Sequence, residues 1–391
     1  MSLFSRTDKS LFGQWWWTVD RVMLAAILSL SLVGVILVAT ASPAVAVHIG
    51  LGDFHFLKRH LIMLIPALGM MITLSFMPKR LVRRIASLVF LASLAAMMLV
   101  LVSGSEIKGA QRWIRVLGFS LQPSEFVKPA FAVMAAWMMA LEKESSDERK
   151  FPGTVVTGGL YAMTVTLLLM QPDFGMTFIV TLIWAAQIFI AGLKFRYLIL
   201  LMLAGVIGIL GVYNGFDHVK SRIDRYLDPD KGDNFQVEKS LEAFREGGIM
   251  GAGPGQGSVK THLPDAHADF IFSVAGEEMG LFFVTIIIGI YGFIMIRGLN
   301  RLMNSSDMFT VLAAGGLLTM FGLQALVHMG SAMQLLPAKG MTLPFISYGG
   351  SSLLAMGFTF GVILSLTRRT VKKGIAKGGL SLQTPKEEVS A

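Results

Sequence analysis

The chain of 391 residues contains no cysteine and few charged residues. Without cysteine, disulfides and thiolate catalysis are excluded, so the loops outside the cytoplasm must fold without covalent cross-links. Only 15% of the residues are Asp, Glu, Lys or Arg, whereas soluble domains carry about 25%. Hydrophobic residues make up 54% of the chain. This balance excludes an ordinary soluble protein and indicates an integral membrane protein.

Several common ligand-binding motifs are also missing. The glycine-rich stretch 251–258 has neither the Gly-Lys-Ser/Thr ending of a P-loop nor the spacing of a dinucleotide fingerprint, which argues against nucleotide binding. The net charge of +9 comes from short basic loops, so no nucleic-acid partner is expected. His262, His267, Asp265 and Asp269 match no strong zinc spacing, and no resident metal is expected.

Apolar runs long enough to cross a hydrocarbon core of about 30 Å recur along the chain. Because backbone groups in lipid must be satisfied within each segment, these runs predict helices. We expect ten spans, at 20–42, 57–77, 81–103, 126–141, 153–171, 174–192, 196–214, 271–296, 308–332 and 345–367. The predicted fold is an all-α integral membrane protein, a single polytopic domain (1–391) with a large extracytoplasmic loop, 215–270, between helices 7 and 8.

Lys and Arg are concentrated in alternate short loops, which places those loops and both termini in the cytoplasm. Segments 1–19 and 368–391 are then a cytoplasmic N-terminal segment and tail. The first apolar run is about twenty residues, longer than the h-region of a signal peptide, so an uncleaved first helix is expected. In the 215–270 loop, Phe235, Leu241 and Phe244 are spaced as in an amphipathic helix that lies on the membrane.

Most cations expected outside lie in two loops, 104–125 and 215–270. The candidate residues in the shorter loop and the helix behind it are Lys108, Arg112, Trp113, Arg115, Gln122, Glu125 and Lys128. Ser124 is placed to cap that helix and Glu125 to lie in its first turn. Because guanidinium groups bind phosphate in a bidentate manner, the loop is interpreted as a phosphate clamp or, alternatively, as an interfacial anchor.

Three further segments place polar groups at membrane depth. Asp173 is either a functional ionisable group or the cap of a helix break. Glu277 and Glu278 lie inside a span, where carboxylates require a cavity or a cationic partner. Prolines, glycines and small hydroxyls break a helix at 336–352, and such backbone must be buried in protein or line a cavity. The candidate residues of this segment are Lys339, Ser347 and Tyr348.

Asp269 is the last polar residue before Phe270-Ile-Phe272 enters the membrane. Partial desolvation at such a boundary makes a carboxylate a better base. The outer face thus combines cations, this carboxylate with His267 close by, and a broken helix, and it carries no nucleophilic Ser/His or Cys/His pair. These features indicate an anionic, lipid-linked substrate that is either transported or transferred.

The motifs that carry a family resemblance run through the whole chain. They lie at 108–114, 121–128, 171–175, 263–272, 276–280 and 343–352. Together they resemble the SEDS family (shape, elongation, division and sporulation). The stretch Lys339-Gly-Met-Thr-Leu-Pro344 favours its division-type branch over the elongation-type one. Two positions depart from the family pattern: Ala268 stands where Thr is usual, and His328 where Asn is usual.

The resemblance implies a ten-helix peptidoglycan glycosyltransferase of the bacterial inner membrane, concentrated at the division septum. Its substrate would be lipid II, the undecaprenyl-pyrophosphate-linked disaccharide peptide, and its partners a class B penicillin-binding transpeptidase and other divisome proteins. The family's essential acid falls on Asp269, and its pocket residues on Arg112, Trp113 and Lys339. No cofactor is implied, with a divalent cation (Mg²⁺ or Mn²⁺) at the pyrophosphate as an alternative. The alternative functions are a lipid II flippase, an elongation-type polymerase and a division scaffold.

Overall fold

The computed structural model describes most of the chain, in ranges separated by gaps. The described residues are 10–107, 110–116, 118–144, 151–192, 208, 211, 213–215, 235–337 and 340–369. Two predicted site residues, Lys108 and Lys339, and most of the predicted span 196–214 lie outside the described residues.

Long apolar helices form most of the described structure. Seven of the described helices are long and apolar enough to cross a membrane: α2 (Arg21–His48), α3 (His55–Ser75), α4 (Lys79–Ser103), α5 (Pro123–Glu144), α6 (Gly153–Met170), α11 (Ile271–Met303) and α12 (Met308–Ala332). Two shorter apolar helices are α7 (Phe174–Ile190) and α13 (Gly350–Leu366). Each predicted span except 196–214 therefore coincides with a helix, and the prediction of a helical membrane protein is confirmed.

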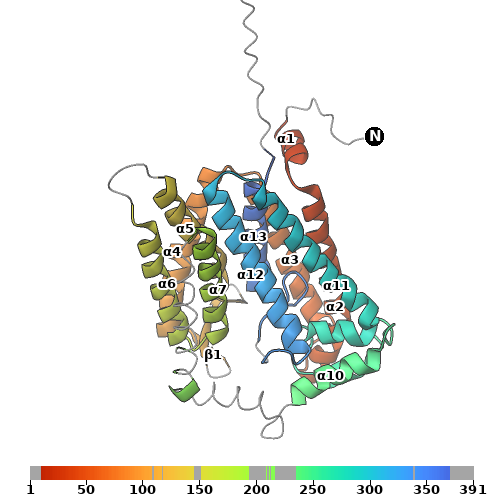
Figure 1. Cartoon of the computed structure of the whole chain (residues 1–391). Coiled ribbons are helices and arrows are strands. Elements are labelled where there is room, and N and C mark those ends of the chain that lie inside the picture. Colours follow the sequence, from red (N-terminus) through yellow and green to blue (C-terminus); the bar gives the residue numbers. More distant parts are fainter. Residues whose placement is uncertain are drawn as a thin grey trace, which may run out of the picture.

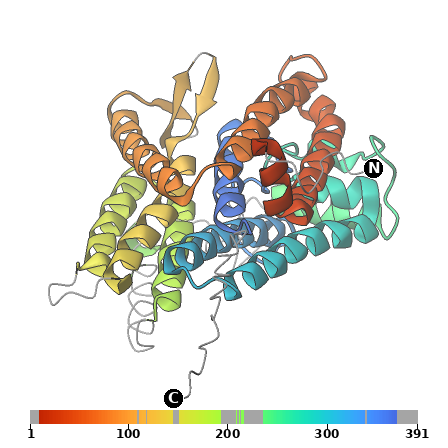
Figure 2. The same ribbon diagram turned by 90° about the horizontal axis from the view of Figure 1, so that it is seen from above.

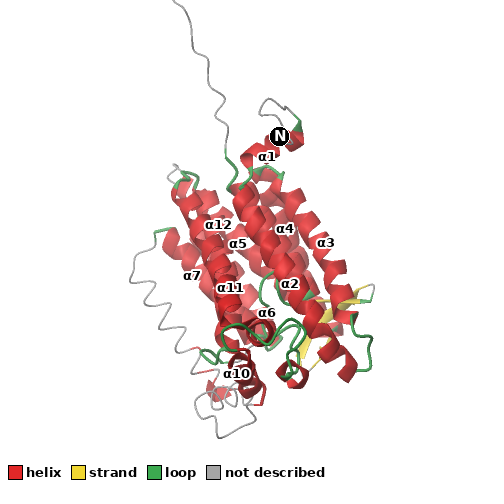
Figure 3. Ribbon diagram, turned by 90° about the vertical axis from the view of Figure 1, so that its right-hand side faces the viewer, coloured by secondary structure: helices red, strands yellow, loops and turns green. Residues whose placement is uncertain are grey.

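The helices run side by side, with α12 and α13 in the middle of the bundle (Figure 1). Helices α4 to α7 pack on one side, while α2, α3 and α11 pack on the other; α12 contacts both α5 and α11. Seen along the bundle, the two groups meet at α12 and α13 (Figure 2). Helix α1 (Leu11–Thr18) lies at one end, and α10 (Phe235–Gly247) and the strands lie at the other (Figure 3). We call these the α1 end and the α10 end. The described parts of both loops predicted outside are thus at the same end.

A small antiparallel sheet replaces the irregular loop predicted after α4. It has the strand order β1 (Ser105–Ile107), β2 (Ala110–Val116) and β3 (Phe119–Leu121). In β2, Ile114 pairs with Leu121 and Arg115 with Ser120. Gly118, in the β2–β3 turn, has a φ of 81°, a conformation that favours glycine. The all-α description therefore needs correction at this sheet.

Helix α10 confirms the helix predicted in the 215–270 loop, but its packing face differs from the prediction. Phe235, expected on the apolar face, is 44% exposed, and the buried positions are Ser240, Ala243 and Gly247. Small residues are required because α10 lies directly on α11: a Cβ at Gly247 would be 2.0 Å from the carbonyl oxygen of Gly276. Backbone contact at Gly247, together with the predicted apolar residue Phe244, whose ring centroid lies 5.8 Å from that of Phe272 in α11, positions this helix.

Helix α11 is broken at Gly280, whose φ of 75° and ψ of 176° are not helical. The sequence predicted an unbroken span here. The break follows from a close approach of the glycine-rich loop, since a Cβ at Gly280 would lie 2.4 Å from the amide nitrogen of Gly251. The N–H of Leu281 donates to the carbonyl of Gly248 at 2.9 Å. The part of α11 before Gly280 is therefore a short helix held at the α10 end.

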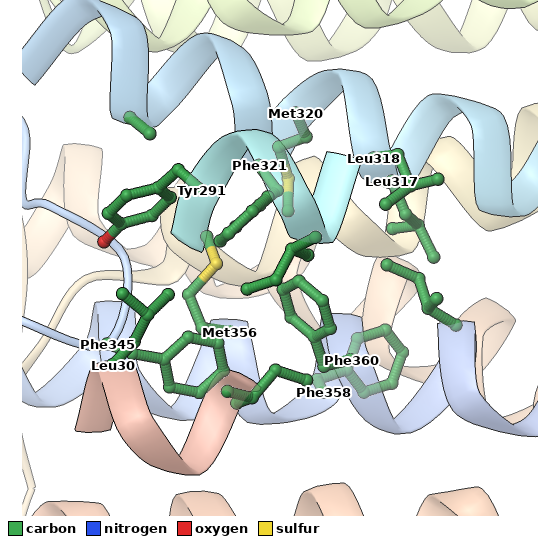
Figure 4. Packing of buried hydrophobic residues seen from close by; sticks show 14 of the residues in the cluster. Leu30, Tyr291, Leu317, Leu318, Met320, Phe321, Phe345, Met356, Phe358 and Phe360 are labelled. Atoms are coloured by element: carbon green, nitrogen blue, oxygen red, sulfur yellow. The ribbon is translucent and has the colours of Figure 1, made fainter. Parts of the chain in front are cut away.

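The segment before α13 is fixed by the apolar core. The hydroxyl of Tyr291 in α11 donates to the carbonyl of Pro344 at 2.5 Å, and the rings of Phe345 and Phe360 lie 5.5 Å apart, centroid to centroid (Figure 4). Gly34 of α2 permits the approach, because a Cβ there would lie 2.5 Å from the carbonyl oxygen of Phe345. The part of the predicted break around Pro344 and Phe345 thus lies against α2, α11 and α13.

Candidate active site

Asp269 lies on a tight turn that directly precedes α11. The amide N–H groups of Ala268 and Asp269 both donate to the carbonyl of Asp265, at 2.9 and 3.0 Å. Asp265 has a φ of 53°, a left-handed conformation that Asp and Asn tolerate better than most residues. The Asp269 side chain is half-buried and lies beside the backbone of Gly340, where a Cβ would be 3.0 Å from Asp269 Oδ2. The turn therefore presents one carboxylate to the segment that follows Lys339.

The segment before α13 also holds this turn. Ser347 Oγ donates to the carbonyl of Ala268 at 2.7 Å and accepts from the N–H of Leu343 at 2.7 Å. The N–H of Tyr348 donates to the carbonyl of His267 at 3.0 Å. Two predicted site residues, Ser347 and Tyr348, are thus brought directly to the Asp269 turn. Their described contacts position the turn.

His267 is buried against aromatic rings and is neutral at physiological pH. Its ring centroid lies 3.9 Å from that of Phe56 and 5.1 Å from that of Tyr348. Burial lowers the pKa of His267 from 6.5 to about 4, although the charge of Asp265 acts in the opposite direction. A neutral imidazole cannot supply a positive charge to a pyrophosphate, so any role of His267 in binding rests on hydrogen bonding or ring contact.

Glu277 and Glu278 are buried with partners, as two carboxylates at this depth require. Glu277 accepts from the N–H groups of Val259 and Lys260, at 2.6 and 3.0 Å. Glu278 forms an ion pair with the ammonium of Lys260. Sequence reasoning missed Lys260, which belongs to no motif. The sequence did contain a signal for it. Two buried acids require a cation, and Lys260 is the nearest Lys or Arg upstream of them.

Arg112 joins the sheet to the connection between α6 and α7. Its Nε donates to the carbonyl of Gln171 at 3.0 Å, and a terminal nitrogen donates to the carbonyl of Pro172. Its Nη1 lies 3.9 Å from Asp173 Oδ2. Asp173 also caps α7, because its Oδ1 accepts from the N–H of Met176 at 3.2 Å. The capping interpretation of Asp173 is confirmed, and much of the Arg112 guanidinium is engaged by backbone carbonyls.

Helix α5 begins one residue earlier than its expected cap. Pro123 is the first helical residue, so Ser124 is inside the helix and the prediction that it caps α5 is wrong. Proline is favoured at this position because the first helical N–H has no partner in any case. Ser124 Oγ instead accepts from Gln122 Nε2 at 3.0 Å. Glu125 lies in the first turn, as predicted.

Lys128 is the centre of a buried polar network. Only 1% of its side chain is exposed, and its ammonium lies 2.9 Å from Glu125 Oε2 and 3.1 Å from Gln324 Oε1. Gln324 Nε2 donates to the carbonyl of Thr342 at 3.1 Å, and Thr342 Oγ1 donates to Ser352 Oγ at 2.6 Å. The positive charge of Lys128 is therefore compensated within the protein, and the network reaches the same segment that faces Asp269.

The predicted site residues thus fall into two groups, one on the Asp269 turn and one around the start of α5. The segment before α13 and the first turn of α13 contact both groups. Asp269 and His267 lie on the turn held by residues 347 and 348, and the N–H of Gln122 donates to Ser351 Oγ at 2.9 Å. Trp113 is half-buried and Arg115 exposed, both on β2. Within the described ranges, no three His, Asp or Glu side chains are grouped so that they could hold a metal ion.

Known proteins resemble this chain over nearly its full length. The family model described as "Cell cycle protein", which covers FtsW, RodA and SpoVE, matches residues 20–372. A protein of Caulobacter vibrioides described as "Probable peptidoglycan glycosyltransferase FtsW" is 42% identical over 367 residues, which is 94% of this chain and 93% of the relative. A Coxiella burnetii protein of the same description is 34% identical, over 90% of this chain and 97% of the relative.

Solved structures show the same fold. A chain from a study titled "Structural coordination of polymerization and crosslinking by a peptidoglycan synthase complex" superposes with a TM-score of 0.73 at 27% identity, over 89% of this chain and 97% of that chain. RodA of Thermus thermophilus superposes with a TM-score of 0.66 at 25% identity, over 90% of this chain and 97% of that chain. Sequence and structure together therefore show that this chain belongs to the SEDS family, the cell-cycle proteins that include FtsW, RodA and SpoVE.

Proposed function

We propose that this chain is a division-type peptidoglycan glycosyltransferase of the bacterial inner membrane, which polymerises lipid II with Asp269 as the general base. The reaction follows from the relatives, which share the FtsW description. The placement of Asp269 carries the assignment of the base: the residue is half-buried at the α10 end, on a turn fixed by its own backbone and by Ser347. A base needs this combination of a partly desolvated carboxylate and a fixed position.

The proposed step is a single displacement at the anomeric carbon of the donor. Lipid II carries its sugar through an α-linked pyrophosphate. The acceptor 4-hydroxyl oxygen bonds to the donor C1 on the opposite face, while the bond from C1 to the pyrophosphate oxygen breaks and its electron pair leaves with the pyrophosphate. Asp269 takes the hydroxyl proton, and the new link is β-1,4. A positioned base contributes about 10²–10⁴-fold to the rate.

The departing pyrophosphate requires cations, and we assign this role to Arg112, Arg115 and Lys339. Arg115 is exposed on β2, and Arg112 is half-buried in the same strand. Lys128, also predicted for this role, is paired with Glu125, so we assign it to holding the segment around Thr342. A divalent cation that bridges the pyrophosphate is the alternative to cationic side chains alone.

The proposed topology places both termini in the cytoplasm and the α10 end outside. It is supported by the α1 end, where the N–H of Arg369 donates to the carbonyl of Thr18 at 3.0 Å, so that the first and last described segments lie on the same side. We further propose a class B penicillin-binding transpeptidase as partner and the septum as location. A solved neighbour from a peptidoglycan synthase complex supports the partner.

The experiment that tests this function is polymerisation of labelled lipid II by the purified chain, with and without the transpeptidase and with and without a chelator. A lipid II translocation assay runs beside it in the same vesicles. We expect glycan strands that lengthen when the partner is present. Translocation without polymerisation, even with the partner, would contradict the proposal and favour the flippase.

A further inference from the structure

The short 3-10 helix η2 (Val259–His262) lies between the glycine-rich loop and the Asp269 turn. It contacts α10 and α11, which flank it in the sequence, and α2, which lies near the start of the chain. Two of its residues, Val259 and Lys260, are buried, and the turn begins within a few residues of its end. The chain is therefore fixed against the membrane helices a few residues before the turn that carries Asp269.

Glu277 of α11 fixes the backbone of η2. Its two carboxylate oxygens accept from the N–H groups of Val259 and Lys260, at 2.6 and 3.0 Å. Gly257 allows the carboxylate to come this close, because a Cβ there would lie 2.7 Å from Glu277 Cδ. Backbone N–H groups at a helix start carry partial positive charge, so they stabilise the buried carboxylate without a cation.

Lys260 ties η2 to two membrane helices through its side chain. Its ammonium pairs with Glu278 of α11 and donates to the carbonyl of Thr40 in α2 at 3.1 Å. The exposed fractions of the two side chains are 6% for Lys260 and 0% for Glu278. A charge buried to this degree is stable only with its partner, so the two side chains hold each other in place.

We propose that Lys260, Glu277 and Glu278 form a clamp that positions the Asp269 turn for the reaction. Lys260 and Glu278 are positioning residues, since both charges are directed at each other within the protein. The clamp holds the turn from the η2 side, and Ser347 and Tyr348 hold it from the α13 side. This inference rests on the proposed role of Asp269 and adds three residues that act through it.

A clamp of this kind affects turnover more than substrate binding. Of the cations proposed for the pyrophosphate, Arg112 and Arg115 lie on β2, whereas the hydrogen bonds of the clamp described above run between η2, α2 and α11. When the clamp is lost, the turn stays attached at its α13 side, and Asp269 is displaced. A displacement of about 1 Å at a reacting group costs on the order of 10²-fold in rate. We therefore expect kcat to fall while the KM for lipid II stays near the wild-type value.

The test compares variants of the full-length protein by hydrogen–deuterium exchange over residues 259–270 and by polymerisation kinetics. Lys260→Met and Glu278→Gln each break the ion pair, and Lys260→Arg preserves it. Because a single variant leaves a buried unpaired charge and can fail to fold, Lys260→Met combined with Glu278→Leu removes both charges together. Lys239→Met is the matched control, since Lys239 forms a 2.6 Å ion pair with Glu242 that is only partly buried on α10.

The clamp predicts loss of exchange protection over 259–270 and a kcat reduced by about 10²-fold at unchanged KM in the folded double variant. Lys260→Arg should keep the wild-type exchange protection and the wild-type kcat, and so should the Lys239→Met control. Wild-type protection and kcat in the double variant would overturn the inference. Failure of the proposed function is distinguishable, because it would show as full activity of Asp269→Asn, whereas the exchange measurement needs no activity.

Discussion

Asp20 at the α1 end and Asp269 at the α10 end are held in different ways. At the α1 end, Asp20 accepts hydrogen bonds from Arg297 at 2.8 and 2.9 Å and from Arg301 at 2.9 Å. Burial alone would raise the pKa of Asp20, but these hydrogen bonds and that from the Met23 N–H hold it below its ordinary value of 3.8. At the α10 end, Asp269 lies on a turn that is held through backbone carbonyls and faces the glycine backbone at Gly340.

This difference separates structural acids from a proposed catalytic one. A carboxylate fixed between two guanidinium groups joins α2 to α11 and is a weak base, because its protonation would break those bonds. A turn held through its backbone carbonyls, like the one that carries Asp269, keeps its backbone position whether or not the carboxylate is protonated. The comparison therefore predicts that substitutions at the two ends affect different properties.

The largest effect is expected for Asp269→Asn. Asparagine preserves shape but cannot accept the proton of the acceptor hydroxyl, so polymerisation should fall by about 10²–10⁴-fold. The Tm in detergent should stay near wild type, since a neutral isostere at a half-buried position changes stability little. Glycan synthesis from labelled lipid II and thermal unfolding measure the two properties. A lower Tm together with lost activity would contradict the proposed difference from Asp20, because Asp269 would then also be needed for stability.

The next largest effect concerns pH and His267. The pKa of its imidazole is about 4 in the folded protein and 6.5 in a model peptide. The unfolded chain therefore binds more protons between these values, and stability is full above about pH 6.5 and falls as the pH is lowered toward 4. The loss is on the order of 3 kcal/mol. Thermal unfolding between pH 7.5 and 4.5 measures it, and His267→Phe, which keeps an aromatic ring, should make that part of the profile less steep than in the wild type.

Asp20→Asn should lower the free energy of unfolding by about 2 kcal/mol. Hydrogen bonds to charged groups contribute about 1.5–3 kcal/mol each. The loss stays within this range because the side chains of Arg297 and Arg301 are partly exposed to water. Polymerisation by the folded fraction should be unchanged. The contribution of Asp20 is present above about pH 4 and is lost as the pH falls through its lowered folded pKa. A drop in kcat of the folded protein would contradict the separation of the two ends.

The smallest effect is expected at His328. Its Nδ1 lies 2.6 Å from the carbonyl oxygen of Met341, next to the glycine that faces Asp269. His328→Leu should cost about 1 kcal/mol and lower polymerisation several-fold, because the carbonyl loses its partner. His328→Asn keeps a donor and should stay closer to wild type. Equal behaviour of the two variants would show that this hydrogen bond does not position the segment.

Sequence reasoning succeeded where one physical requirement dominates. The membrane helices were predictable because a span must satisfy its own backbone and bury apolar side chains, and Asp173 as a cap follows from the break before α7. A cationic partner, found for Glu278, was one of the two alternatives expected from the depth of this acid pair, whereas the backbone N–H partners of Glu277 were not predicted. The place of Asp269 just before α11 was predicted as well, because it is the last polar residue before an apolar run, and its role as the base stays a prediction.

The features that were missed depend on contacts between distant segments. The break at Gly280 requires the approach of Gly251, which no local pattern encodes. The partner of Glu278 is Lys260, a lysine without a motif. The sheet at 105–121 was hidden because its strands are short and β2 carries cations that resemble a loop. In each case tertiary contact, rather than local propensity, determines the structure.

The most direct test of the account compares Asp269→Asn with Asp265→Asn in the same polymerisation assay. Both changes neutralise a half-buried carboxylate of one turn, and asparagine tolerates the φ of 53° at position 265. If Asp269 is the base, Asp269→Asn should lose about 10²–10⁴-fold in rate and Asp265→Asn should remain near wild type. Near-normal polymerisation by Asp269→Asn, or an equal loss in both variants, would contradict the account.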